Sequence, residues 1–257
     1  MIKIGEWGQA MKNEWKNVWM KHSADIEILQ GKDRKKIFLE LKRSNGFDVI
    51  GDGLSYEALM CQYIQIKENL TLGTCGTEKK EVKSVYEVGC GSGANLYLFE
   101  SDGMQTGGID YSENLIQAAK KVLSSEDIIC DEAINIPVTP AYDSVFSNSV
   151  FSYFENENYA WDVLEKMYQK SKYSIGLIDI HDIEKKEEFI IYRRKNVENY
   201  EERYKNLPKL FYSRRMFIDF AKKHGMDIKF TDSEVDGYWN NEFVFNCYMY
   251  KRRKQDK

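Results

Sequence analysis

One stretch of the 257-residue chain, Ser-Val-Tyr-Glu-Val-Gly-Cys-Gly-Ser-Gly-Ala-Asn at 84–95, constrains the fold more than any other. Val85, Tyr86 and Val88 have the β-branched and aromatic side chains that strands favour. Three glycines at alternate positions then leave a tight turn without Cβ atoms, and a helical pattern follows. Because the first N–H groups of a helix have no partner within the helix, they can bind a ligand. The stretch therefore predicts a strand, a turn and a helix, with a ligand against the turn.

Glu87 precedes the first glycine by two residues, where a carboxylate can accept hydrogen bonds from hydroxyls or an amine but repels a pyrophosphate. This acid-x-Gly-x-Gly-x-Gly pattern resembles the first motif of class I S-adenosylmethionine-dependent methyltransferases. The resemblance implies that Glu87 lies beside the methionine part of the cofactor. Gly89-x-Gly91-x-x-Ala94 also fits the permissive dinucleotide fingerprint, and a plain tight turn is a third interpretation. The expected cofactor contacts of this motif are Glu87, Gly89, Cys90, Gly91 and Gly93.

From residue 84 onward, strand-like and helix-like segments alternate, which predicts an α/β fold with a doubly wound, mostly parallel sheet. After residue 211, the pattern indicates a helix that begins after Ser213 and ends at Gly225, and then two strands. By resemblance, the fold is a seven-stranded Rossmann-like sheet with an antiparallel last strand. The expected elements are strand 84–88, helix 94–101, strand 105–109, helix 113–123, strands 127–130 and 142–147, helix 158–170, and strands 174–179, 227–230 and 242–250.

The segment before the glycine stretch predicts an N-terminal helical cap over residues 1–82, and residues 83–257 form the core. Three apolar stripes at helical spacing begin at Met11, Ile37 and Leu59, and Ser55 is the expected N-cap of the third helix. In the family that the chain resembles, such helices cover the cofactor and line the acceptor site. Trp15 and Trp19 are therefore candidates for substrate binding, with Tyr63 a weaker one. The mixed-charge segment 183–210 is an expected lid, with a dimer contact as the alternative.

The second strand ends at Asp110, followed by Tyr111 and Ser112. A carboxylate at the tip of this strand can accept hydrogen bonds from both hydroxyls of a ribose. We expect all three residues to contact the cofactor. The alternative is that Asp110 caps the next helix, and a dinucleotide-binding protein also has an acid here.

Two neighbouring acids follow the third strand. In the family that the chain resembles, an apolar-Pro pair follows the residues that contact adenine. If the Ile-Pro pair at 136–137 corresponds to it, the adenine contact is Glu132 with Ala133. If the contact is instead the first acid after the strand, it is Asp131. Both are retained as candidates, and an exposed turn is the alternative.

The ends of the fourth and fifth strands supply the expected acceptor side. By resemblance, the polar and aromatic loop after residue 147 reaches the methyl-transfer centre, with Asn148 and Ser149 assigned to the cofactor and Phe151 to the substrate. His181 and Asp182 follow the fifth strand, where open α/β sheets bind ligands. We expect His181 to orient or deprotonate the acceptor, with Tyr153 as the second catalytic candidate and Asp182 in substrate binding. A structural histidine is the alternative.

Composition limits the function classes. A formal charge of −4 argues against general nucleic-acid binding, and the five cysteines have no Cys-x-x-Cys spacing, which indicates free thiols in a reducing compartment. No apolar run has the length of a membrane span, and no metal-ligand constellation is visible. The expected protein is cytoplasmic, a monomer or homodimer, and free of metal.

These features together predict a methyltransferase that uses S-adenosyl-L-methionine, releases S-adenosyl-L-homocysteine, and methylates an oxygen or nitrogen of a small molecule by in-line displacement. Because the Asn-Pro-Pro-Tyr-type motif of nucleic-acid and protein amine methyltransferases is absent, a small acceptor such as a sugar, nucleotide-sugar or secondary metabolite is favoured. The alternatives are a nicotinamide-dependent oxidoreductase, a protein or RNA methyltransferase, and a binding protein without turnover.

Overall fold

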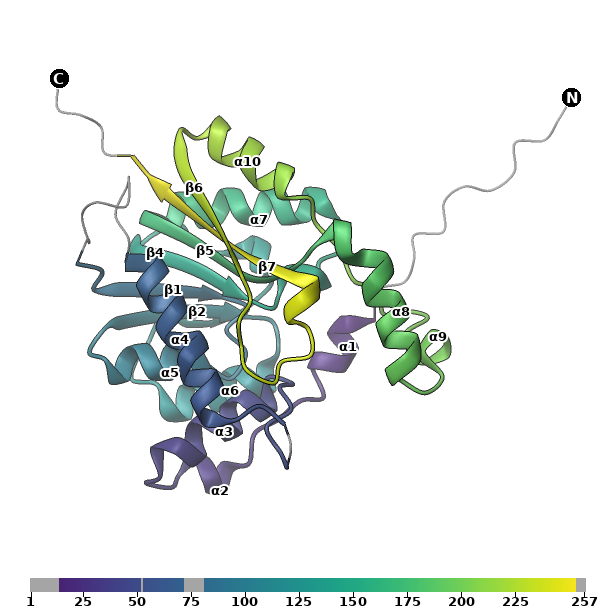
Figure 1. Ribbon diagram of the computed structural model, residues 1–257. Helices are drawn as coiled ribbons and strands as arrows, with labels where there is room; N and C mark the ends of the chain where they lie inside the picture. Colours follow the sequence, from purple (N-terminus) through teal and green to yellow (C-terminus); the bar gives the residue numbers. More distant parts are fainter. Residues whose placement is uncertain (1–13, 52, 72–80, 253–257) are drawn as a thin grey trace, which may run out of the picture.

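A seven-stranded sheet forms the centre of the computed structural model, which describes residues 14–51, 53–71 and 81–252 (Figure 1). The strand order is β3-β2-β1-β4-β5-β7-β6, and β7 runs antiparallel to both of its neighbours. The predicted fold class is therefore confirmed, including the antiparallel last strand. The strands are β1 Ser84–Val88, β2 Gln105–Asp110, β3 Ile128–Cys130, β4 Tyr142–Asn148, β5 Ser171–His181, β6 Met226–Asp232 and β7 Val244–Lys251.

Helices cover both faces of the sheet, because successive strand residues point to opposite faces. On β1, Val85 packs in one apolar cluster and Tyr86 in the other. The first cluster contains side chains of α3 Arg34–Ser44, α4 Tyr56–Thr71, α5 Ala94–Ser101 and α6 Glu113–Val122, and the second contains those of α7 Glu157–Lys170 and α10 Arg214–Lys223. Ser213 caps α10 as predicted, because its Oγ accepts the Arg215 N–H at 3.1 Å.

The N-terminal segment contains one helix more than predicted. Helices α1 Trp15–Trp19, α3 and α4 correspond to the three apolar stripes, and Ser55 Oγ accepts the Ala58 N–H at 3.0 Å. The additional helix is α2 Ile26–Leu29, which has four residues and an Asp25 cap. Such a short helix has no repeating stripe that the sequence could reveal. Met11 lies outside the described residues.

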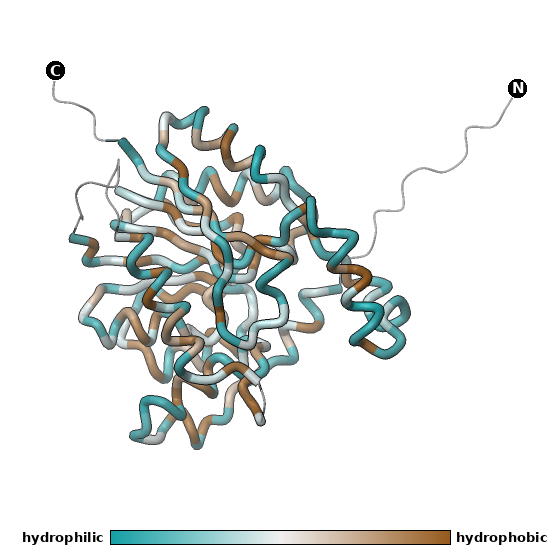
Figure 2. Tube along the Cα trace, viewed as in Figure 1, coloured by the Kyte–Doolittle hydropathy of each residue, from teal (hydrophilic) through white to brown (hydrophobic). Residues whose placement is uncertain are grey.

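The segment 183–210 folds into the 3-10 turn η4 Ile183–Lys185, helix α8 Lys186–Asn196 and the short helix α9 Tyr200–Arg203. Figure 1 shows α8, α9 and α1 beyond the carboxyl ends of the parallel strands, and most of α8 and α9 is hydrophilic in Figure 2. Trp15 Nε1 donates to the Pro208 carbonyl at 2.6 Å, which ties this segment to α1.

The long strand β5 is interrupted by a bulge between Leu177 and Ile180. Asp179 has a φ of 62° there. Short 3-10 turns follow other strands: η2 Ala133–Asn135, η3 Phe151–Tyr153 and, before β7, η5 Asn241–Phe243.

Four of the five cysteines, Cys61, Cys90, Cys130 and Cys247, are free thiols, and Cys75 lies outside the described residues. In the described part of the chain, no helix is both long and apolar enough to cross a membrane.

Candidate functional site

A cavity of about 750 Å³ opens at the carboxyl ends of β1, β2, β4 and β5. In open α/β sheets this is where ligands bind, and the volume lies in the upper half of the range of about 300–1,000 Å³ for ligand pockets. Thirteen of the predicted site residues line it. They are Trp15, Trp19, Glu87, Gly89, Gly91, Asp110, Tyr111, Glu132, Ala133, Asn148, Ser149, Tyr153 and His181.

Three predicted cofactor residues near the glycine turn and β2 do not line the cavity. Cys90 is 1% exposed and packs in the core beneath the turn. Gly93, with a φ of 79°, is the N-cap of α5, and a Cβ there would meet Leu123 at 2.8 Å. Ser112 donates its hydroxyl to the Trp19 carbonyl at 3.3 Å and so holds the N-terminal segment.

The other predicted residues outside the cavity lining have partners of their own. Asp131 is exposed and accepts a hydrogen bond from Asn135 at 2.8 Å. Asp182 caps η4 and lies 3.3 Å from Arg214. Phe151 is fully buried in the core, and the weaker candidate Tyr63 donates to Asp102 at 2.6 Å.

The glycine turn is bare where the cavity touches it. Gly89 and Gly91 have φ angles of 74° and 52°, which L side chains rarely adopt. A Cβ on Gly89 would lie 2.3 Å from Val150, and one on Gly91 would lie 2.3 Å from Asn45 Oδ1. The turn therefore requires glycine at both positions.

Glu87 is 2% exposed and joins a buried polar chain. Its Oε1 accepts a hydrogen bond from Asn95 Nδ2 at 2.6 Å, and Asn95 Oδ1 accepts one from Lys42 Nζ at 2.9 Å. Burial raises the pKa of Glu87 and lowers that of Lys42, while their mutual attraction opposes both changes. In the described part of the chain, Glu87 Oε2 has no hydrogen-bond partner, so this carboxylate has an oxygen available to a ligand.

Asp110 lies between the glycine turn and α6. Its carboxylate accepts the N–H of Gly91 at 2.9 Å and that of Ser112 at 2.8 Å. Asp110 therefore lies in the cavity lining and does not itself cap α6, whose N-cap is Ser112. Burial raises the pKa of Asp110 to about 6, against the opposing effect of these two hydrogen bonds.

Of the two competing acids after β3, only Glu132 lines the cavity, together with Ala133. Glu132 forms an ion pair with Lys16 of α1, which connects this wall of the cavity to the N-terminal segment.

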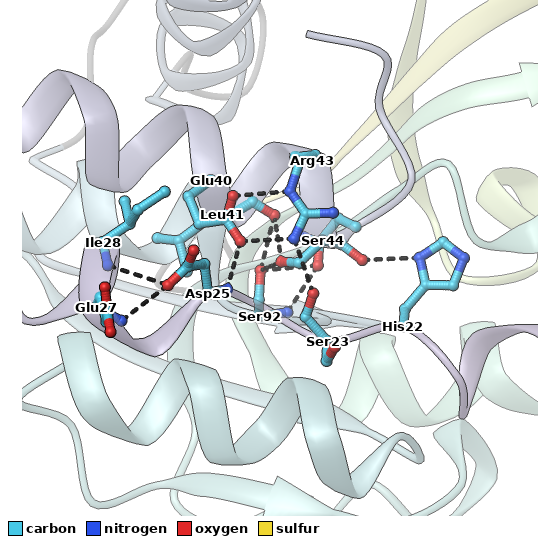
Figure 3. A network of polar contacts seen from close by, with 11 residues as sticks. His22, Ser23, Asp25, Glu27, Ile28, Glu40, Leu41, Arg43, Ser44 and Ser92 are labelled. Atoms are coloured by element: carbon cyan, nitrogen blue, oxygen red, sulfur yellow. Dashed lines mark hydrogen bonds and ion pairs between the residues drawn. The ribbon is translucent and has the colours of Figure 1, made fainter. Parts of the chain in front are cut away.

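A polar network attaches the N-terminal segment to the glycine turn (Figure 3). Ser92 Oγ donates to the Leu41 carbonyl at 2.8 Å, and Ser44 Oγ donates to Ser92 at 2.9 Å. Glu40 accepts hydrogen bonds from Arg43 and from the Asp25 N–H, which fixes the segment before α2 against α3. The position of the turn therefore depends on α3.

The other end of the cavity is built around Asp179, which is 4% exposed. Its carboxylate accepts hydrogen bonds from Ser149 at 2.5 Å, Tyr238 at 2.9 Å and Asn240 at 3.3 Å. Burial raises the pKa of Asp179, while these hydrogen bonds and the positive charge of Lys209 oppose the change.

His181 and Tyr153 share this end of the cavity with Lys209. Burial lowers the pKa of His181 well below its usual value, and the positive charges of Lys209 and Arg193 add to the effect. Burial raises the pKa of Tyr153, so its hydroxyl stays protonated at neutral pH. Lys209 lies over the Tyr153 ring at 4.9 Å.

Several lining residues escaped the sequence analysis: Lys42, Asn45, Asp179, Lys209 and Tyr238. Only Asp179 carried a signal, because it precedes His181 by two residues on the same strand. In the described part of the chain, no group of three His, Cys, Asp or Glu side chains is arranged to hold a metal ion.

Comparison with known proteins agrees with this geometry. Residues 86–173, from β1 to the start of β5, match the methyltransferase domain family. This match and the fold confirm the predicted resemblance to S-adenosylmethionine-dependent methyltransferases. No curated protein sequence matches the chain.

Solved structures share the fold of this chain at low sequence identity. The plantazolicin methyltransferase BpumL, in complex with a triazolic desmethylPZN analog and SAH, has 18% identity and a TM-score of 0.59, with 94% of this chain and 100% of that chain covered. Magnesium protoporphyrin IX methyltransferase from Synechocystis PCC 6803, with bound SAM, has 13% identity and a TM-score of 0.54 over 87% and 99% of the two chains. N-methyltransferase NodS from Bradyrhizobium japonicum WM9 has 12% identity and a TM-score of 0.52 over 77% and 98%.

Proposed function

We propose that this chain is an enzyme that transfers a methyl group from S-adenosyl-L-methionine to an oxygen or nitrogen of a small molecule. The observation that carries the proposal is that one cavity unites Glu87, Asp110 and Glu132 with polar side chains at the end of β5. By resemblance to class I methyltransferases, the first three are the acids assigned to the methionine part, the ribose and the adenine of the cofactor. The volume is sufficient for a nucleoside cofactor and a small acceptor together.

The cavity lining supports this cofactor in two ways. Glu87 Oε2 is buried without a partner, which suits the ammonium group of the methionine part, and Lys42 is near enough to bind its carboxylate. The bare backbone at Gly89 and Gly91 permits close approach of a ligand. Asp110 is assigned to the ribose hydroxyls, and Glu132 with Ala133 to the adenine ring.

When bound, S-adenosylmethionine supplies an electrophilic methyl group on sulfur for in-line displacement. The contribution of this chain is to position the acceptor and to exclude water. Trp15, Trp19 and Tyr153 are suited to that role, because their rings pack edge to face over the cavity, with Tyr153 4.7 Å from Trp15 and 5.3 Å from Trp19.

His181 and Tyr153 are proposed to contact the acceptor. The lowered pKa of His181 makes it a weak base, so we assign it hydrogen bonding to the acceptor rather than proton removal. Tyr153 keeps its proton and serves as a donor. An amine acceptor needs no base if it arrives neutral.

A small acceptor is proposed because the N-terminal segment and the segment 183–210 both border the cavity, through Trp15 and Lys209. The same proposal includes a cap over residues 1–82, a core over residues 83–257 and a lid formed by residues 183–210. It also includes a cytoplasmic location and a monomeric or homodimeric state. The neighbours named above are methyltransferases of a porphyrin and of plantazolicin, so a modified peptide is a further candidate acceptor. The alternative function is a nicotinamide-dependent oxidoreductase.

Calorimetric titration with S-adenosylmethionine, S-adenosylhomocysteine and NAD tests the proposal. We expect micromolar binding of the first two and none of NAD. Glu87→Gln should weaken binding by about tenfold or more, because a charge-assisted hydrogen bond contributes about 1.5–3 kcal/mol. The exposed Glu113→Gln is the matched control. Binding of NAD alone would establish the oxidoreductase instead. Methyl transfer from labelled cofactor to a low-mass metabolite extract then tests turnover.

A further inference from the structure

Three cationic side chains line the cavity: Lys16, Lys42 and Lys209. Lys16 forms an ion pair with Glu132, and Lys42 donates to Asn95. Within the described ranges, the ammonium of Lys209 makes no hydrogen bond or ion pair; it lies over the rings of Tyr153 at 4.9 Å and Trp15 at 5.8 Å. The ammonium of Lys209 is therefore available to bind a ligand.

The imidazole of His181 is a second group that is available to a ligand. Its ring is 2% exposed, and neither Nδ1 nor Nε2 has a hydrogen-bond partner among the residues that the structure describes. The edges of Phe189 and Phe211 pack against the ring, with centroids 5.1 and 5.3 Å away, so the imidazole is held in place without polar support. A neutral imidazole has one N–H donor, and leaving it unpaired in a buried site is unfavourable.

Asp179, by contrast, needs no ligand. Ser149, Tyr238 and Asn240 already donate to its carboxylate. Among the described residues, the groups without a partner at this end of the cavity are the Lys209 ammonium, the His181 imidazole and Asn240 Oδ1. The ammonium and the imidazole N–H can donate to an anion, whereas Asn240 Oδ1 can accept a hydrogen bond from another part of the same ligand.

We propose that the acceptor molecule carries a carboxylate, which accepts hydrogen bonds from Lys209 and His181. This inference rests on the proposed function and narrows its substrate class. A carboxylate adds one negative charge beside Asp179, whose charge already acts on Lys209, whereas a phosphate monoester adds nearly two at neutral pH and would be repelled more strongly. Arg193, a further cation, is already engaged, because it donates to Tyr204 at 2.7 Å and lies 4.9 Å from the Trp239 ring.

The walls beside these donors are aromatic. Trp15 and Tyr153 form one side, and Tyr238 and Trp239 lie on another part of the lining. Trp239 is 39% exposed and stacks on Tyr192, with ring centroids 5.6 Å apart and an angle of 5° between the rings. Aromatic walls favour an acceptor with a flat apolar part next to its carboxylate.

Three matched probes test the inference: indole-3-propanoate, its amide, and the corresponding primary amine. Each is titrated into the full chain saturated with S-adenosylhomocysteine, and binding is followed by calorimetry and by nitrogen NMR of the imidazole rings. The chain has only three histidines, so His181→Gln identifies the His181 signals. We expect the carboxylate to shift these signals and to bind about tenfold more tightly than the amide. Lys209→Met should abolish the preference, and the exposed Lys222→Met should leave it unchanged.

Equal affinity for acid and amide, tighter binding of the amine, or no binding of any probe at millimolar concentration would overturn the inference. Unchanged preference in Lys209→Met would also overturn it. The titration with S-adenosylhomocysteine comes first in every variant and reports both folding and the cofactor site. Failure of that step in the unaltered protein contradicts the proposed function itself, whereas normal cofactor binding without acid preference contradicts only the carboxylate.

Discussion

The hydroxyl of Ser149 donates to the carboxylate of Asp179 across 2.5 Å, and the two residues have φ angles of 60° and 62°. Positive φ is uncommon outside glycine and persists where the surroundings enforce it. Here the Ser149 N–H donates to the Ile178 carbonyl at 3.0 Å, and the Asp179 N–H donates to Asn246 at 3.0 Å. The ends of β4 and β5 therefore hold Asp179 in the cavity at some cost in backbone energy.

This cost predicts a difference between two substitutions at one position. Ser149→Ala and Ser149→Gly both remove the donor to Asp179, but only glycine relieves the positive φ. A left-handed backbone costs a non-glycine residue about 1–2 kcal/mol, and part of the gain is offset by the greater freedom of glycine in the unfolded chain. We expect Ser149→Gly to be more stable than Ser149→Ala by about 1 kcal/mol in denaturant unfolding. Equal stability would mean that the backbone there is unstrained.

The part of the site that the sequence predicts is the part built from consecutive residues. Glu87 and the glycine turn lie within one strand-turn-helix unit, and Asp110 ends the next strand, so spacing along the chain corresponds to position in space. The bounds of β1 and α5 match the prediction for the same reason, because these elements begin and end where the apolar and glycine patterns do. By contrast, β5 is longer than the expected strand 174–179 and includes His181, and β7 starts two residues later than expected.

The remainder depends on contacts between distant segments. Lys42 comes from α3, Lys209 from the end of the segment 183–210, and Tyr238 from the loop before β7; nothing near them in sequence indicates a common cavity. Side-chain direction after a strand end is equally hard to predict. Phe151 turns into the core because η3 follows β4, and Asp182 becomes a cap because η4 follows β5.

Lys209 should reduce the stability of the protein. Burial lowers its pKa to about 8, so at pH 7 the folded protein carries a charge that is better solvated in the unfolded chain. The group therefore costs stability below pH 8, and that cost is removed as the pH rises from about 8 toward the ordinary lysine value of 10.5.

We expect Lys209→Met to raise the free energy of unfolding at pH 7 by about 1 kcal/mol, allowing for partial exposure, with a gain of about 2–4 °C in Tm. The difference between the two proteins should shrink at pH 10. A variant that is less stable than the original at pH 7 would show that attraction to Asp179 outweighs burial.

Cofactor binding should depend on the ionisation of Asp110. Its pKa of about 6 lies above the ordinary value of 3.8, so the carboxylate takes up its proton at a higher pH than an exposed aspartate does. The ionised form accepts hydrogen bonds from ribose hydroxyls, and protonation removes that capacity in part. We expect the contribution of Asp110 to the affinity for S-adenosylhomocysteine to be complete above about pH 7 and to be lost as the pH drops through 6. Calorimetry at several pH values measures this. In Asp110→Asn, affinity should be lower throughout and the fall near pH 6 should disappear; a retained fall would assign the titration to another group.

Asn45 links the N-terminal segment directly to the glycine turn. Its Oδ1 accepts hydrogen bonds from the Ser92 N–H at 2.8 Å and from Ser92 Oγ at 2.9 Å, and Ser92 is fully buried. Because an unsatisfied buried donor costs about 1–3 kcal/mol, Asn45→Ala should lower the free energy of unfolding by that amount.

The same substitution should weaken binding of S-adenosylhomocysteine by about tenfold, because the side chain of Asn45 also packs against Gly91 of the glycine turn. Asn114→Ala is the matched control. Asn114 also joins the N-terminal segment to the core, by donating to the Met20 carbonyl at 3.0 Å, but it is exposed and does not touch the turn. We expect Asn114→Ala to cost about 0.5 kcal/mol and to leave cofactor affinity unchanged. If both variants bind S-adenosylhomocysteine equally well, the turn keeps its shape without α3, and the N-terminal segment contributes to stability alone.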